Sequence, residues 1–133
     1  MSTQLSSQIL EAHKGEHRIV LLLTETESDP NFQDQIDRFR DHVPGLEERK
    51  LIVYHITPKS YRQVFVEKTH TAPNETAKEL YEQYAIEDSS FTFVLIGLDG
   101  MVKKRQVDVM PASELFDLID AMPMRKEEIR KKK

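Results

Sequence analysis

Three short apolar runs divide the chain, and each has the composition of a β-strand. They are Ile19–Leu23, Leu51–Ile56 and Phe91–Ile96. The first two are continuous rather than alternating, which is the pattern of a strand covered on both faces. We therefore predict that Ile19–Leu23 is a central strand and that Leu51–Ile56 is a buried strand parallel to it.

Between the first two runs, apolar residues recur at the spacing of one helix face. Asp29 is suited to cap this helix, Pro30 to be its first residue, and Pro44-Gly45 to end it. The buried stripe is predicted to consist of Phe32, Ile36, Phe39 and Val43.

Helical spacing returns twice more, after Asn74 and after Pro111, each of which can begin a helix. The first apolar face is Ala77, Leu80, Tyr81 and Tyr84. The second is Leu115, Phe116, Leu118, Ile119 and Met122. Pro123 then can begin a further helical turn, since proline is tolerated there.

Two segments have weaker patterns. Ser7–Gly15 can form a short helix, with Ser7 as its N-cap and Gly15 as a left-handed stop. Pro58–Pro73 allows a turn of helix or a short strand, and we predict that it is mostly loop.

The third apolar run leads into a predicted β-hairpin. Asp99-Gly100 separates Phe91–Ile96 from Met101–Val109, and Asp-Gly between strand-like runs is a strong hairpin signal because both residues tolerate positive φ. We expect a tight type I′ turn at Asp99-Gly100.

The predicted order of elements is β-α-β-α-β-β-α. A right-handed crossover and an antiparallel hairpin then give a mixed four-stranded sheet between helices, the α/β three-layer sandwich of a thioredoxin-like fold. A flavodoxin-like sheet is the alternative. The expected organisation is a domain over residues 17–124, an N-terminal extension over 1–16 with a possible helix, and an exposed basic extension over 125–133.

The absence of cysteine from all 133 residues limits the chemistry. It excludes disulfides, thiolate metal sites and cysteine nucleophiles. The reactive loop of a thioredoxin-like enzyme would be Thr24–Pro30, which carries Glu25, Glu27 and Asp29, and the facing Ser89–Phe91 lacks a proline. The five histidines show no metal-binding spacing, and His55 is expected to be half-buried and structural. We predict neither a metal nor a cofactor.

Charge is unevenly distributed. Six basic and two acidic residues follow position 124, so the net charge of −4 leaves about −8 on the rest of the chain. An acidic body argues against nucleic-acid binding, and no apolar run reaches membrane-spanning length. Residues 1–13 lack a basic start and an apolar stretch, which predicts a cytoplasmic protein, with a processed secreted or periplasmic form as the alternative.

Two segments, Leu95–Lys103 and Leu115–Arg125, carry a family resemblance. They resemble a poorly characterised thioredoxin-like domain of bacterial proteins that also occurs in the animal DRO–URB–equarin–sushi-repeat group and whose molecular function is undefined. The resemblance spans roughly His17 to Glu128. The chain departs from the family pattern at Leu98, where a lysine is common. It implies that the signature residues are Arg49, Gly97, Asp99, Gly100, Lys103, Asp120, Met122, Pro123, Met124 and Arg125.

Two functions are compatible with this pattern. The first is a non-redox binding module whose partner is a protein. The second is an enzyme or small-anion binder that uses Lys103, Asp120 and Arg125, where the arginine supplies a bidentate fork. The same residues could instead attach the last helix to the hairpin. The sequence does not indicate an oligomeric state.

Overall fold

The computed structural model describes residues 13–26, 28–65 and 74–132. Its strands are β1 (Arg18–Thr24), β2 (Leu51–Ile56), β3 (Tyr61–Gln63), β4 (Phe91–Ile96) and β5 (Val102–Gln106). Its helices are α2 (Pro30–Arg40), α3 (Val43–Glu48), α4 (Asn74–Tyr84), α5 (Ala112–Asp120) and α6 (Pro123–Lys132). Among these helices, none combines the length and apolarity needed to cross a membrane.

The strands form one mixed sheet in the order β3-β2-β1-β4-β5. β1 is central and parallel to β2, as predicted, and it is antiparallel to β4. The sheet has five strands rather than the expected four, because β3 lies in the segment predicted to be mostly loop. The Thr57 hydroxyl accepts hydrogen bonds from the amides of Lys59 and Ser60 and so closes the turn that returns β3 onto β2. A three-residue strand is too short to show a period in the sequence.

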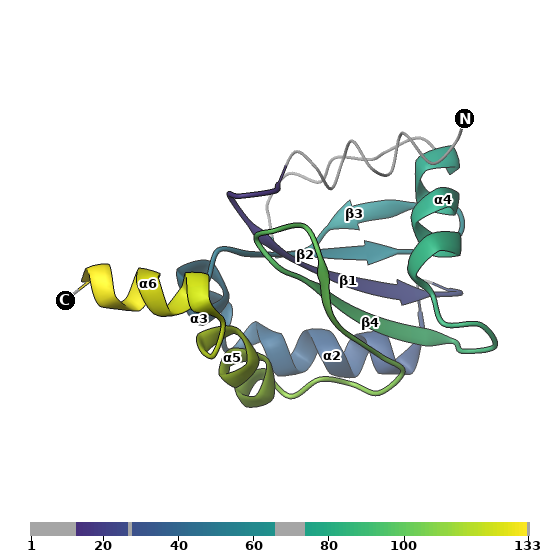
Figure 1. The fold of residues 1–133 in the computed structure, drawn as a ribbon. Helices are drawn as coiled ribbons and strands as arrows, with labels where there is room; N and C mark the ends of the chain where they lie inside the picture. The colour runs from purple at the N-terminus through teal and green to yellow at the C-terminus, as the bar shows by residue number, and fades with distance from the viewer. Residues whose placement is uncertain (1–12, 27, 66–73, 133) are drawn as a thin grey trace.

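Helices cover both faces of the sheet (Figure 1). Val20 and Leu22 of β1 face α2, α3 and α5, whose buried side chains complete the larger core. The neighbouring Ile19, Leu21 and Leu23 face the opposite way, toward Leu80 of α4. This two-sided burial explains why β1 is a continuous apolar run.

α2 begins as expected and ends earlier than expected. The Asp29 carboxylate accepts hydrogen bonds from the amides of Asn31 and Phe32, and Pro30 is the first helical residue. The helix stops at Arg40, however, and Pro44-Gly45 lies inside α3 instead of ending α2. A Cβ at Gly45 would lie 2.8 Å from the Phe116 ring, so the absence of a side chain lets α3 approach α5.

The β4–β5 hairpin is present, but its turn is not type I′. The Gly100 amide donates to Gly97 O and the Gly97 amide donates to Met101 O, which encloses a three-residue connection. Only Gly100 in it has positive φ, at 81°. This is a type I turn followed by a left-handed glycine. The Asp99 carboxylate accepts from the Met101 amide, so its side chain stabilises the turn without a positive φ of its own.

Three further predictions concern residues near the N- and C-termini of the chain. The predicted helix Ser7–Gly15 lies outside the described residues except for its last positions, where Gly15 does adopt a left-handed φ of 82°. Leu118, expected on the inner side of α5, is exposed. Arg125, expected in an exposed extension, is only 2% exposed because α6 turns it toward α3 and α5. It therefore belongs to the packed part of the chain.

Candidate functional site

The end of β1 that carries the reactive loop in thioredoxin-like enzymes is closed by a buried polar pair. The Thr24 hydroxyl donates to Thr26 O at 2.6 Å and therefore accepts the hydrogen bond from His55 Nε2 at 2.8 Å. The His55 ring stacks on Phe32 with 3.6 Å between centroids. His55 is fully buried rather than half-buried, and burial, with a smaller effect of Arg62, lowers its pKa to about 4.

The residues around this pair offer no converging chemical groups. Asp29 is occupied as a helix cap, and Glu25 is exposed. Glu27 lies outside the described residues. In the facing loop, the Ser89 hydroxyl donates to Ile86 O, and no described peptide bond is cis. Within the described ranges, no three His, Asp or Glu side chains gather as they would around a metal ion.

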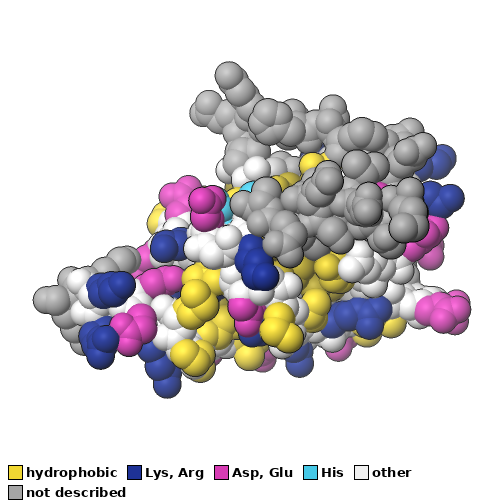
Figure 2. All heavy atoms as spheres, turned by 45° about the horizontal axis from the view of Figure 1, so that its top comes forward, with side chains coloured by type: hydrophobic (Ala, Val, Ile, Leu, Met, Phe, Trp, Pro, Cys, Tyr) yellow, Lys and Arg dark blue, Asp and Glu magenta, His cyan; other side chains and the backbone are white. Residues whose placement is uncertain are grey.

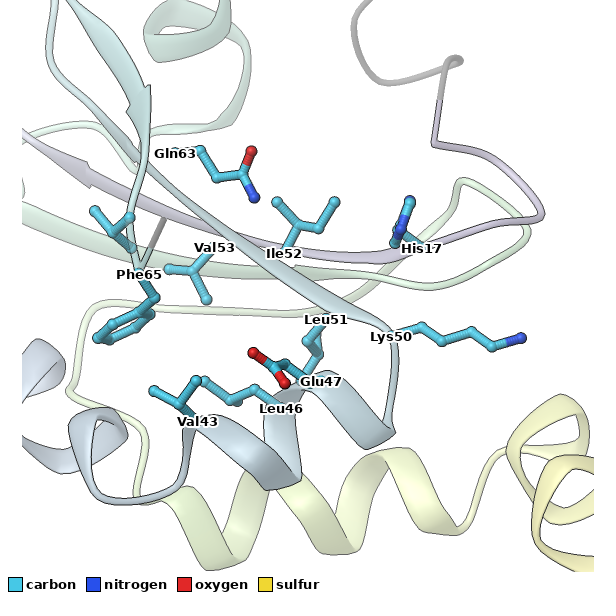
Figure 3. Close-up of a pocket in the computed structure, with 11 residues that line it drawn as sticks. His17, Val43, Leu46, Glu47, Lys50, Leu51, Ile52, Val53, Gln63 and Phe65 are labelled. Atoms are coloured by element: carbon cyan, nitrogen blue, oxygen red, sulfur yellow. The ribbon is translucent and has the colours of Figure 1, made fainter. Parts of the chain in front are cut away.

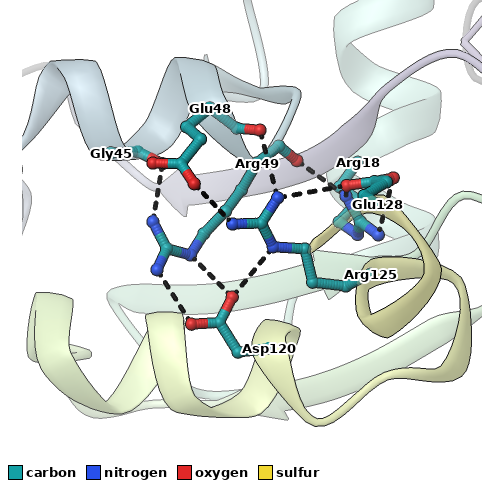
Figure 4. Close-up of polar contacts among 7 residues, drawn as sticks. All are labelled: Arg18, Gly45, Glu48, Arg49, Asp120, Arg125 and Glu128. Atoms are coloured by element: carbon teal, nitrogen blue, oxygen red, sulfur yellow. Dashed lines mark hydrogen bonds and ion pairs between the residues drawn. The ribbon is translucent and has the colours of Figure 1, made fainter. Parts of the chain in front are cut away.

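The opposite end of β1 holds a dense ionic cluster (Figure 4). We call it the Arg125 cluster, and it consists of Arg18, Glu48, Arg49, Asp120, Arg125 and Glu128. The Arg125 guanidinium donates from Nε to Asp120 at 2.9 Å, from Nη2 to Glu48 at 2.8 Å and from Nη1 to Glu128 at 3.3 Å. One side chain thereby joins α6 to α3 and α5.

Two more arginines complete the cluster. Arg49 forms a two-pronged ion pair with Asp120, at 3.1 and 2.9 Å, and its guanidinium lies 4.0 Å over the Phe116 ring. Arg18 donates to Arg49 O at 2.8 Å and to both Glu128 oxygens. Three guanidinium groups thus face three carboxylates, and the cluster is balanced in charge.

Two carboxylates of the cluster, Asp120 and Glu128, have lowered pKa values. Burial opposes ionisation of Asp120, but hydrogen bonds and charges of Arg49 and Arg125 outweigh it and lower the pKa. Burial also opposes ionisation of Glu128, and Arg18 and Arg125 lower its pKa in the same way.

The structure brings together only part of the predicted polar set. Asp120 and Arg125 are in direct contact, and the signature Arg49 joins them. Lys103 is not with them, because its ammonium pairs with Asp99 at 2.7 Å on the hairpin. Sequence reasoning missed Arg18, Glu48 and Glu128. The position of Arg18 directly before an apolar run is the one signal that could have indicated a buried cation.

A hollow of about 250 Å³ separates the hairpin from the start of α6. We call it the hairpin–α6 hollow, and it is lined by Arg18, Gly97, Leu98, Asp99, Lys103, Met122, Pro123 and Met124. Six of these residues are signature residues of the family resemblance. Arg18 contributes a buried Nε that has no hydrogen-bond partner in the described structure.

Gly97 and a β-bulge shape this hollow. Leu95 pairs with Lys104 and Ile96 with Val102, which leaves Lys103 as the extra residue of β5. A Cβ at Gly97 would lie 2.6 Å from Lys103 Cε, so glycine makes room for the lysine stem to cross. Bulges commonly redirect a side chain in this way. The spacing of Gly97, Asp99 and Lys103 therefore has a direct geometric cause.

A second depression, of about 330 Å³, lies between α3 and the β2–β3 edge (Figure 3). Its floor is largely aliphatic, with Glu47 and Lys50 as its charged lining residues. His17 also lines it and contacts His13, which in turn hydrogen-bonds the Tyr54 hydroxyl at 2.7 Å. Burial, with a smaller effect of Tyr61, raises the Tyr54 pKa to about 12, so this hydroxyl stays protonated at neutral pH.

Known structures support the thioredoxin-like fold over the flavodoxin-like alternative. The chain is similar to a 2-Cys peroxiredoxin of Plasmodium vivax, with a TM-score of 0.60 and 16% identity over 89% of this chain and 84% of that one. A mitochondrial 2-Cys peroxiredoxin of Plasmodium falciparum gives a TM-score of 0.55 and 17% identity over 84% and 79%. At such identities the likeness concerns the fold alone, and this chain lacks cysteine.

Sequence relatives lie in the sushi-repeat group. The chain is 25% identical to the rat sushi repeat-containing protein SRPX and 24% identical to the mouse protein, over 129 residues in each case. The alignment covers 97% of this chain but only 28% of either relative. Residues 9–128 match a family described as a domain of unknown function, DUF4174. The resemblance found in the two signature segments is thereby confirmed, and the chain belongs to the DUF4174 family as a thioredoxin-like domain without cysteine.

Proposed function

We propose that this domain is a non-redox binding module that holds a protein partner at the hairpin–α6 hollow. The observation that carries the proposal is the composition of the hollow, where apolar side chains of two distant segments meet a charged rim. Leu98 and Met122–Met124 supply the apolar part, and the Lys103–Asp99 ion pair supplies the rim. Apolar hollows with a few polar groups are the usual form of a binding site.

The methionines make this surface suited to a protein side chain. Met124 is 50% exposed and Met101, on the adjoining hairpin, is 64% exposed. Hydrophobic side chains gather on the face beside the projecting α6 in Figure 2. Methionine is flexible and polarizable, and it is frequent on surfaces that bind other proteins. An exposed patch of this kind favours an interaction over a purely structural role.

The alternative of an enzyme or small-anion binder built on Lys103, Asp120 and Arg125 has weaker support. The Arg125 guanidinium already donates to Asp120, Glu48 and Glu128, so an anion would have to displace carboxylates. Lys103 is also held by Asp99. These contacts favour a supporting role for Arg125, which fixes the start of α6 beside the hollow.

Met124→Asp tests the proposed docking site. It places a charge in the hollow at a half-exposed position, so the domain should fold while partner binding falls by about tenfold or more, as at the centre of an interface. The measurement is quantitative capture from a native lysate with the immobilised domain, and thermal unfolding verifies that the variant is folded.

Leu118→Asp is the matched control, because Leu118 is an exposed apolar residue of α5 that does not line the hollow. It should capture the same proteins as the wild-type domain. Equal loss in both variants would contradict the proposed site. Capture of nothing by the wild-type domain, together with turnover of a metabolite, would contradict the binding function itself.

A further inference from the structure

β5 is an edge strand that adjoins the hairpin–α6 hollow. In the described part of the chain it pairs with β4 on one side and with no strand on the other. The four residues Val102–Arg105 are exposed. An edge strand presents a row of unpaired amide and carbonyl groups, which can pair with another extended segment.

Apolar side chains flank this open edge. Met101 is 64% exposed, Val102 46% and Val107 44%. They are three of the five large apolar side chains that are exposed among the described residues, the others being Leu118 and Met124. An exposed edge with apolar residues at both ends is a liability for a free protein unless another chain covers it.

The charge of β5 indicates what could cover it. Lys103, Lys104 and Arg105 are consecutive in a chain whose net charge is −4. Asp99 pairs with Lys103, but among the described residues Arg105 donates only to the neutral carbonyls of Tyr84 and Ala85. No ion pair of Lys104 occurs within the described ranges. The strand therefore carries uncompensated positive charge.

The same charge disfavours a second copy of this chain as the cover. Edge-to-edge pairing of two β5 strands would bring two basic strands together, and like charges on paired strands are destabilising. An acidic strand would instead meet opposite charges along its length.

We propose that β5 accepts an acidic, extended segment of a protein partner as an additional strand of the sheet. The proposal rests on the proposed function and specifies its partner. Main-chain hydrogen bonds to β5 would supply affinity. Acidic side chains on one face of the added strand would meet Lys104, because consecutive strand residues such as Lys104 and Arg105 point to opposite faces of the sheet. An apolar side chain of the partner would enter the hollow beside Lys103. Strand addition of this kind takes its specificity from such side-chain contacts.

The test uses a short blocked peptide in which glutamate alternates with valine, and a counterpart with lysine in place of glutamate. The full chain should bind the acidic peptide and not the basic one, as measured by fluorescence anisotropy. Main-chain amides of β5 should gain protection from hydrogen exchange when the acidic peptide binds. Lys104→Glu should weaken binding by roughly tenfold, because it reverses a charge at the interface.

Lys59→Glu is the matched control, since Lys59 is an exposed lysine in the turn at the other edge of the sheet and the charge change is the same. It should leave binding unchanged. Equal binding of both peptides, no binding of the acidic one, or unprotected β5 amides would overturn the proposal. So would concentration-dependent protection of these amides without peptide, which would indicate a second copy.

The two proposals fail differently. If lysate capture is lost in Met124→Asp but kept in Lys104→Glu, the hollow remains a docking site while strand addition at β5 is wrong.

Discussion

At one end of β1, Thr24 and His55 form a neutral hydrogen-bonded pair that is buried under Phe32. At the other end, Arg18 joins a cluster of six charged side chains beside a hollow. The first end is where a thioredoxin-like enzyme carries its reactive loop. The second end carries most of the signature residues of the family resemblance.

The difference between the two ends shows that a thioredoxin-like fold can form with its charged groups gathered at the end of β1 opposite to the reactive loop. Burial at the Thr24 end favours neutral groups, because an isolated charge there would lose its hydration. The Arg125 cluster retains its charges because each guanidinium meets carboxylates, two of which, Asp120 and Glu48, remain partly solvated. The second end thus combines charged and apolar side chains around the hairpin–α6 hollow.

Removal of Arg125 should give the largest effect on stability. Arg125→Ala leaves Asp120, Glu48 and Glu128 without their shared partner and detaches α6 from α3. Loss of one member of a buried ion pair costs about 3–5 kcal/mol. Because Asp120 keeps Arg49, Glu128 keeps Arg18 and Glu48 is partly solvated, we expect a loss at the lower end of that range, about 3 kcal/mol. Urea unfolding of wild type and variant measures the change in free energy.

Arg130→Ala is the comparison for that measurement, because Arg130 pairs with Glu127 on the exposed side of the same helix. It should change stability by less than about 0.5 kcal/mol. Equal losses for the two variants would show that the Arg125 cluster does not hold α6 in place.

Burial of His55 at the Thr24 end should make the stability of the protein depend on pH. The His55 pKa is about 4 in the folded protein, below its ordinary value of 6.5. Between these values the unfolded chain binds a proton that the native state does not. The contribution of His55 to the free energy of unfolding is therefore fully present above about pH 6.5. It is lost as the pH drops toward 4, by on the order of 3 kcal/mol in total. Urea unfolding at several pH values measures this slope.

His55→Phe should remove most of that slope while it keeps the stacking on Phe32. A smaller slope of the same sign should remain from His13, whose pKa burial and His17 lower. Below about pH 4.5 the variant should still lose stability, because Asp120 and Glu128 have lowered pKa values and become protonated there. An unchanged slope in the variant would contradict the assignment to His55.

The smallest stability effect is expected at Lys103. Lys103→Ala removes an ion pair with Asp99 whose two side chains are 33% and 42% exposed, so stability should change by less than about 0.5 kcal/mol. Partner capture should nevertheless decrease, because the lysine forms part of the rim of the hollow. A variant that loses stability but captures its partner normally would reverse this expectation.

Sequence patterns predicted those features that depend on residues close together in the chain. The Asp29 cap, the start of α2 at Pro30 and the two-sided burial of β1 follow from residues within one element and its neighbours. The type I′ turn was a wrong prediction, because the Gly97–Met101 hydrogen bond selects a three-residue connection that Asp99-Gly100 alone does not specify. The end of α2 was also wrong, because Pro44-Gly45 suits the start of one helix as well as the end of another.

The candidate site was harder to predict, because its members are far apart in sequence. Asp120 and Arg125 were identified together, but Arg18 and Glu48 contact them only across the folded chain. Lys103 was grouped with the wrong partners because spacing does not show that a bulge directs its side chain across Gly97.

The sequence by itself determined the thioredoxin-like arrangement of strands and helices, since apolar periodicity and capping residues act over one or two turns of chain. It also determined that no thiol chemistry is possible, because that depends only on the absence of cysteine. Only the tertiary structure decided which end of β1 carries the Arg125 cluster and the hairpin–α6 hollow. Burial, charge balance and the hairpin–α6 hollow arise from contacts between segments about 100 residues apart, as between Arg18 and Glu128, and no local pattern encodes them.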